Sequence, residues 1–245
     1  MRKRLRMNRQ PTRSAFLYIK LVFQSQLHVC FPTNHSLSLR FFSIGCITSR
    51  FNMAADTLNV SDNPPFTLIS STGRKDHPEL ETHRCAYMAT IMAEIHNVII
   101  RALNSAYYHA GNVKPGTQDA ANLLQYSQII CELIETHHDW EETSYYPAIE
   151  AFAQQPGILQ GSVEQHKAFE KGMHNFHEYC RATSKEEYTS SSFRALIDEF
   201  SRPLNKHLHE EPTVFYSLGH LDSNGLDRIY LEQEKIVVAK GDPWK

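Results

Sequence analysis

The sequence has no stretch of 18 consecutive apolar residues, although 41% of its 245 residues are apolar. A membrane-spanning helix needs about 20 such residues in succession, so we expect no membrane partner. The formal net charge of −2 gives no global argument for a nucleic-acid partner. The sequence also lacks a glycine-rich phosphate-binding loop, a Ser-His-Asp or Cys-His arrangement, and any flavin or haem motif. These absences leave an ordinary folded protein without a common catalytic signature.

Cysteine is scarce and irregularly placed, with five residues and no CxxC pair. Cys30 and Cys46 lie near the N-terminus, whereas Cys85, Cys131 and Cys180 are widely spaced along the rest of the chain. This pattern argues against a disulfide framework and against a zinc knuckle. It fits a reducing compartment, and we therefore expect a cytoplasmic protein.

Acidic residues are missing from residues 1–55, which carry nine Lys and Arg, whereas the remaining 190 residues hold 16 basic and 27 acidic residues. An Arg-rich, acid-free N-terminus is typical of a mitochondrial transit peptide, which would change the expected compartment to mitochondrial. Alternatively, residues 1–52 are a gene-model extension, because Met53 opens MAADTLNVSDNPP like a natural start. In either case residues 1–55 are predicted to be a disordered extension.

The rest of the chain predicts an all-α fold. Residues 56–80 are rich in turn-forming residues and are interpreted as a linker. Apolar residues then recur at helical spacing in four segments, and no stretch shows the alternation of a strand. Four helices joined by short loops favour an up-down-up-down four-helix bundle over residues 81–220. The four predicted helices span about 82–109, 117–149, 162–182 and 193–218, and the tail 221–245 is expected to hold a short helix over about 226–239.

Histidines and glutamates fall on the apolar stripes of these helices. His96 shares a face with Met92 and Ile99 and therefore points toward the core. Burying so many ionisable groups without partners would cost several kcal/mol per charge, which a metal ion avoids because it binds neutral imidazoles and ionised carboxylates. The other inward pairs, each one helical turn apart, are His138 with Glu142, His166 with Glu170, and His207 with Glu211.

This ligand set predicts two metal ions. The segments HDWEETSYY and HLHEEPTVF both read His-x-x-Glu-Glu before an aromatic cluster, so two helices offer similar ligands. Four histidines with two or three carboxylates exceed the needs of one tetrahedral zinc ion, but they suit two octahedral ions of intermediate hardness. Nitrogen and oxygen ligands without thiolate indicate iron first and manganese second.

Five blocks of the sequence resemble the hemerythrin-like (HHE cation-binding) proteins, and more closely their fungal members. They are HRCAYMATIMAEIHNVIIRALN, VKPGTQDAANLLQY, HHDWEETSYYPAIE, EQHKAFEKGMHNFHEY and LNKHLHEEPTVFYSL, and they cover about residues 77–220. The resemblance implies a hemerythrin-like bundle with a metal set of His96, His138, Glu142, His166, His207 and Glu211. The family's helix-three motif is His-x-x-x-His, whereas this chain has Glu170 at the second position. As a ligand, Glu170 would favour ferric iron and weaken reversible oxygen carriage.

Helix two leaves one alternative open. His137 and Glu141 have the same spacing as His138 and Glu142, and periodicity does not distinguish the two pairs. The family's YYP-like ending favours His138 and Glu142. The expected function is a non-haem diiron protein that binds dioxygen or a related diatomic ligand, or iron itself for sensing or storage. The alternative is a diiron oxidase or a peroxide- or nitric-oxide-handling enzyme, which is less favoured because no reductase motif shares the chain.

Overall fold

The computed structural model describes residues 66–240, with side chains through residue 237. The predicted N-terminal extension, residues 1–55, and the last residues, 241–245, lie outside the described part. Within residues 66–240 every regular element is helical, and none of these helices has the length and hydropathy needed to cross a membrane. The main helices are α2 (Arg84–Ala110), α3 (Gln118–Trp140), α4 (Tyr146–Ala153), α5 (Gln160–Ala182), α6 (Ser190–Val214) and α7 (Ser223–Lys240).

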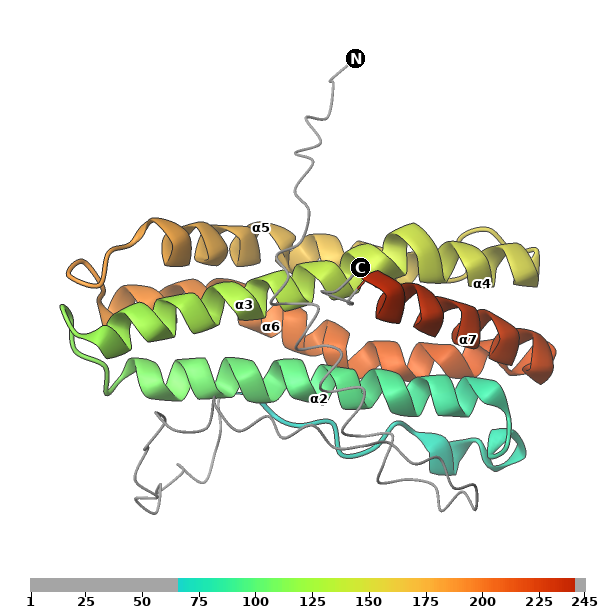
Figure 1. Cartoon of the computed structure of the whole chain (residues 1–245). Helices are drawn as coiled ribbons and strands as arrows, with labels where there is room; N and C mark the ends of the chain where they lie inside the picture. Colours follow the sequence, from blue (N-terminus) through green and yellow to red (C-terminus); the bar gives the residue numbers. More distant parts are fainter. Residues whose placement is uncertain (1–65, 241–245) are drawn as a thin grey trace, which may run out of the picture.

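Four helical columns form the bundle (Figure 1). The columns are α2, α3 continued by α4, α5 and α6, and each packs against two neighbours in the cyclic order α2, α3, α5, α6. Thr117 and Thr189 cap α3 and α6 by accepting backbone hydrogen bonds from Ala120 and Ser192, both of 3.3 Å. The predicted all-α, up-down-up-down four-helix bundle is confirmed.

The apolar core consists of two clusters separated by a polar layer. On α2, Met92 belongs to one cluster and Ile99 to the other, and His96 lies between them. Leu204 of α6 and Phe215, directly after the end of α6, likewise belong to different clusters on either side of a His/Glu pair. The polar layer therefore crosses the middle of the bundle, with hydrophobic packing above and below to hold its position.

A π-helical turn, Glu141–Tyr145, joins α3 to α4. This turn contacts α7, which packs outside the bundle against α2 and α4 (Figure 1). Buried Gln233 of α7 accepts hydrogen bonds from Trp140 Nε1 (3.1 Å) and from Ser144 Oγ (2.7 Å). Helix α7 extends over 223–240, in the region where a short helix over about 226–239 was expected.

An extended segment, residues 66–72, runs along the outside of α2, and we call it the strap. Its Phe66 and Ile69 are buried. The side-chain amide of Asn104 bonds both the N–H and the C=O of Phe66 (2.9 and 2.8 Å). Asn97 holds Ile69 in the same way (2.8 and 3.0 Å). The strap thus belongs to the folded unit, although residues 56–80 as a whole read as a linker.

Candidate metal centre

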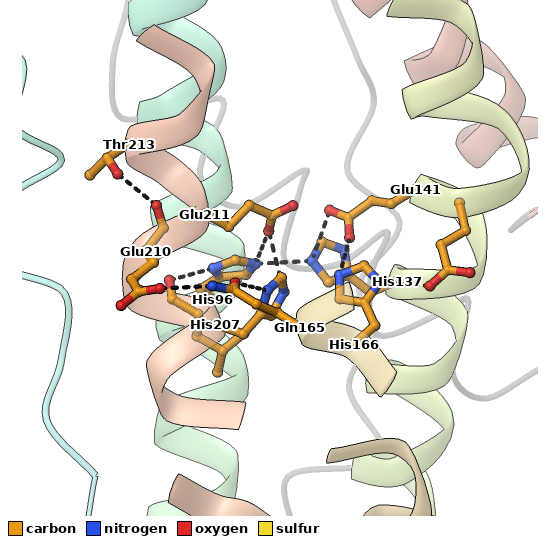
Figure 2. A network of polar contacts seen from close by, with 11 residues as sticks. His96, His137, Glu141, Gln165, His166, His207, Glu210, Glu211 and Thr213 are labelled. Atoms are coloured by element: carbon orange, nitrogen blue, oxygen red, sulfur yellow. Dashed lines mark hydrogen bonds and ion pairs between the residues drawn. The ribbon is translucent and has the colours of Figure 1, made fainter. Parts of the chain in front are cut away.

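The polar layer gathers ionisable side chains from all four columns of the bundle (Figure 2). Each of them is 6% exposed or less, so the whole cluster is enclosed by protein. The cluster contains five histidines and two glutamates: His96 from α2, His137 and His138 from α3, Glu141 from the π-helical turn, His166 from α5, and His207 and Glu211 from α6.

The cluster divides into two groups of possible metal ligands. One group is His138, Glu141, His166 and His207. The other is His96, His137, Glu141 and Glu211, and in each group the potential ligand atoms lie within 4.8 Å of one another. Glu141 belongs to both groups, so one buried carboxylate connects two neighbouring candidate ion sites.

The two carboxylates face the imidazole nitrogens (Figure 2). Oε1 of Glu141 lies 3.3 Å from Nε2 of His137, and its Oε2 lies 3.7 Å from Nε2 of His166. Oε2 of Glu211 lies 3.2 Å from Nε2 of His96 and 3.5 Å from Nε2 of His207. Each carboxylate therefore lies between histidines from two different helices.

Several of these buried atoms have no hydrogen-bond partner within the described part of the chain. They are both ring nitrogens of His138, Nε2 of His166 and of His207, and both oxygens of Glu141 and of Glu211. A buried polar atom without a partner costs about 1–3 kcal/mol, and native proteins contain few of them. Here they share one small volume and, apart from the one N–H of the neutral His138 ring, they are lone-pair donors. A bound cation satisfies them together, so the residues present fit a metal site.

The electrostatics of the metal-free cluster favour its neutral form. Burial, reinforced by neighbouring imidazoles, holds the pKa of His137, His138 and His207 well below its usual value. Burial and the nearby Glu211 raise the pKa of Glu141 well above its usual value. The histidines are therefore already in the unprotonated form that binds metal, and a cation would compensate the charge of an ionised Glu141.

The structure brings together five of the residues expected as metal ligands: His96, His138, His166, His207 and Glu211. Two other expected ligands, Glu142 and Glu170, lie outside both groups and are exposed. The sequence left open whether His138 with Glu142 or His137 with Glu141 faces the core. The structure shows neither pair alone, because His137, His138 and Glu141 all enter the cluster.

Helix geometry explains the position of Glu141. A residue three or four positions ahead on a helix lies on the same face, and Glu141 is four residues after His137 and three after His138. The inward direction passes between the two histidines and meets Glu141. Glu142 lies about 100° farther round, at the rim of the bundle.

Helix geometry also explains the position of Glu170. The buried residues of α5 run from His166 to Phe169 and Met173, so the inward direction one turn after His166 is taken by Phe169. Glu170 points to the exposed side. The family's His-x-x-x-His motif would place a second imidazole at position 170 of α5. In this chain His138 of α3 supplies an imidazole to the same group as His166.

Comparisons with known proteins agree with this geometry. The family model described as "Hemerythrin HHE cation binding domain" matches residues 87–218. The chain is 35% identical over 174 residues to the "Dimeric xanthone biosynthesis cluster protein R11" of Cryptosporiopsis sp. (strain 8999), covering 71% of this chain. It spans 66% of the length of that curated relative. No solved structure matches the chain.

Proposed function

Since this chain belongs to the family of hemerythrin HHE cation-binding domains, we propose that its buried cluster holds two iron ions and binds dioxygen or a related small ligand. The observation that carries the proposal is the sharing of Glu141 between two groups of four ligands each. The His138 group would hold one ion, and the His96 group would hold the other. When bound, the iron pair supplies two adjacent redox-active ions that exchange electrons with a small ligand.

The ligand set supports iron over zinc. Each group combines imidazole nitrogens with carboxylate oxygens and contains no thiolate, which suits an ion of intermediate hardness. A structural zinc site is closed by four ligands, whereas an octahedral ion has six positions. Four protein ligands in each group therefore leave coordination positions for an exogenous ligand.

The surroundings of the cluster suit a small uncharged ligand. The ring of Phe169 lies 5.1 Å from that of His138 and 5.6 Å from that of His207. The hydrophobic clusters close the layer on both sides, so bulk water is kept away from the ligand nitrogens. A site that excludes water suits the binding of a small uncharged molecule and limits hydrolytic side reactions.

Metal content tests the proposal. The full chain is reconstituted with ferrous iron without oxygen, desalted and analysed for metal, and we expect about two iron ions per chain. Oxygen is then added while the absorbance spectrum is recorded, and a charge-transfer band is expected. A single retained iron ion per chain, or no retained metal, would contradict the dinuclear proposal.

A pair of variants tests the shared ligand. Glu141→Ala removes a ligand from both groups, so the loss of both ions is expected. Glu164→Ala is the matched control, because Glu164 is an exposed glutamate of α5 outside either group. Removal of one ion by Glu141→Ala would indicate that the two groups do not share this carboxylate.

A second candidate is a diiron oxidase. The observation that favours it is the name of the fungal relative, which places that protein in a xanthone biosynthesis cluster. The two candidates differ in oxygen use. A binding protein takes up oxygen in proportion to its iron, whereas an oxidase consumes it continuously with a reductant and an organic substrate present.

A further inference from the structure

Three histidines of the cluster have their outer ring nitrogen fixed by an oxygen atom. Nδ1 of His96 lies 2.7 Å from the carbonyl oxygen of Leu208. Nδ1 of His166 lies 2.8 Å from Oε1 of Glu142. The third is His207, whose Nδ1 lies 3.2 Å from Oε1 of Gln165.

These contacts assign the tautomer of each ring. A carbonyl or carboxylate oxygen only accepts, so the facing Nδ1 carries the proton and Nε2 keeps its lone pair. The orientation of the Gln165 amide follows from its other contact, because its Nε2 donates to Oε2 of Glu210 (2.7 Å; Figure 2). In all three histidines Nε2 is the atom that faces the buried carboxylates.

The three acceptors differ in charge. His96 donates to a backbone carbonyl and His207 to a neutral amide, whereas His166 donates to a carboxylate. A carboxylate that accepts the Nδ1 proton makes the imidazole a more basic and more strongly held metal ligand than a neutral acceptor does.

We propose that Glu142 is a positioning residue of the metal centre, which fixes His166 as an Nε2 ligand and strengthens its bond to the ion of the His138 group. This inference rests on the proposed function. It gives the two ions unequal surroundings, because within the described residues no carboxylate bonds the Nδ1 of His96. The ion of the His138 group should be released more slowly and should be harder to reduce than it would be without Glu142.

The chain offers a matched control for this role. Glu135 of α3 and His177 of α5 form a pair of the same kind, with Oε1 of Glu135 3.2 Å from Nδ1 of His177. Glu135 and Glu142 have the same side-chain exposure of 39%, and both histidines are buried. His177 belongs to neither ligand group. Any purely structural effect of losing a carboxylate next to a buried histidine should therefore appear in both pairs.

The experiment compares wild type, Glu142→Gln and Glu135→Gln, all as the full chain loaded with ferrous iron. Gln keeps an oxygen acceptor and removes the charge. The readouts are the transfer of iron to an excess of a ferrous chelator, the reduction potential from a spectroelectrochemical titration, and the melting temperature of the metal-free protein. For Glu142→Gln we expect iron affinity to fall by about 10- to 100-fold and the potential to become more positive. For Glu135→Gln we expect both to equal wild type.

Three outcomes would overturn the inference. In the first, Glu142→Gln releases iron as slowly as wild type at an unchanged potential. In the second, Glu135→Gln releases iron as much faster than wild type as Glu142→Gln does, which would show that the effect is purely structural. In the third, wild type itself retains no iron, and the proposed function then falls together with the inference. The first two outcomes leave the dinuclear centre intact, so the two failures are distinguishable.

Discussion

Gln233 of α7 accepts a hydrogen bond of 3.1 Å from the indole Nε1 of Trp140, the last residue of α3. The same oxygen accepts from Ser144 Oγ, inside the π-helical turn that carries Glu141. A helix outside the bundle is therefore bonded to the segment that contributes the shared carboxylate.

Replacing Gln233 with alanine should destabilise the protein. The change leaves the half-buried Trp140 and Ser144 donors without their acceptor, and an unsatisfied donor costs up to about 1–3 kcal/mol when it is fully buried. Urea denaturation of the metal-free protein measures the loss. Glu232→Ala, on the exposed side of α7, is the control and should leave the free energy of unfolding nearly unchanged. Equal stabilities of the two variants would show that the contact contributes nothing.

Substitutions of His138 and of Glu170 should have different effects on the iron content of the protein. His138 is buried in one ligand group, so His138→Ala should lower iron content from about two ions toward one. Glu170 is exposed and outside both groups, so Glu170→His should change neither the iron content nor the rate of oxidation. Metal analysis and stopped-flow absorbance after mixing with oxygen provide the measurements. A slower oxidation of Glu170→His would show that this side chain reaches the metal.

The stability of the metal-free protein should fall as pH decreases through the range below about 6.5. The pKa values of His137, His138 and His207 are held well below their usual value of 6.5 in the folded state. In this range the unfolded chain binds protons that the folded chain excludes, which lowers the free energy of unfolding by up to about 1.4 kcal/mol per pH unit for each histidine.

Glu141 acts in the opposite direction. Its pKa is raised above the usual 4.5, so its contribution is complete below that pH and is lost as pH rises through the folded pKa. Within the cluster one carboxyl opposes four histidines, because burial also lowers the pKa of His166, and the net slope between about pH 5 and 6.5 should be positive. Denaturation at several pH values measures it, with His138→Asn expected to reduce the slope and the exposed His174→Asn to leave it unchanged. A stability independent of pH from 7 to 5 would refute this account.

Deleting residues 1–52 should leave metal content and melting temperature unchanged. The described part of the chain begins at Phe66 and the first bundle helix at Arg84, so the deletion removes none of the residues that form the described core. Metal analysis and thermal melting of the truncated and full-length proteins test this. A truncated protein that aggregates or melts lower would place part of the fold before Met53.

The bundle could be predicted because its signal repeats along each helix. Met92, His96 and Ile99 already place a histidine on a core stripe, and the other helices repeat this pattern. The sequence also brought His137 and Glu141 forward as an alternative of equal spacing. It could not show that His137 and His138 both enter the cluster, because an ideal helical stripe assigns one inward residue per turn, whereas here the inward direction passes between two neighbours.

Contacts between helices were beyond the reach of periodicity. The hydrogen bond that Glu142 accepts from His166 joins two columns at the bundle rim, and the partner that Glu142 meets depends on how the columns are rotated. The π-helical turn adds a local change of register that no residue pattern announced. The placement of Glu170 likewise followed from Phe169, an apolar neighbour that takes the inward direction.

The spacing of the two asparagines on α2 matches the spacing of the strap residues that they bond. Asn97 and Asn104 are seven residues apart, which is about 10.5 Å along a helix. Their partners Ile69 and Phe66 are three residues apart, which is about 10 Å of extended backbone. Because the two lengths agree only in this register, inserting or deleting one residue between Phe66 and Ile69 releases one amide clamp while the other stays closed. The strap therefore packs on α2 in a single register, with Ile69 bonded to Asn97, the residue that follows His96.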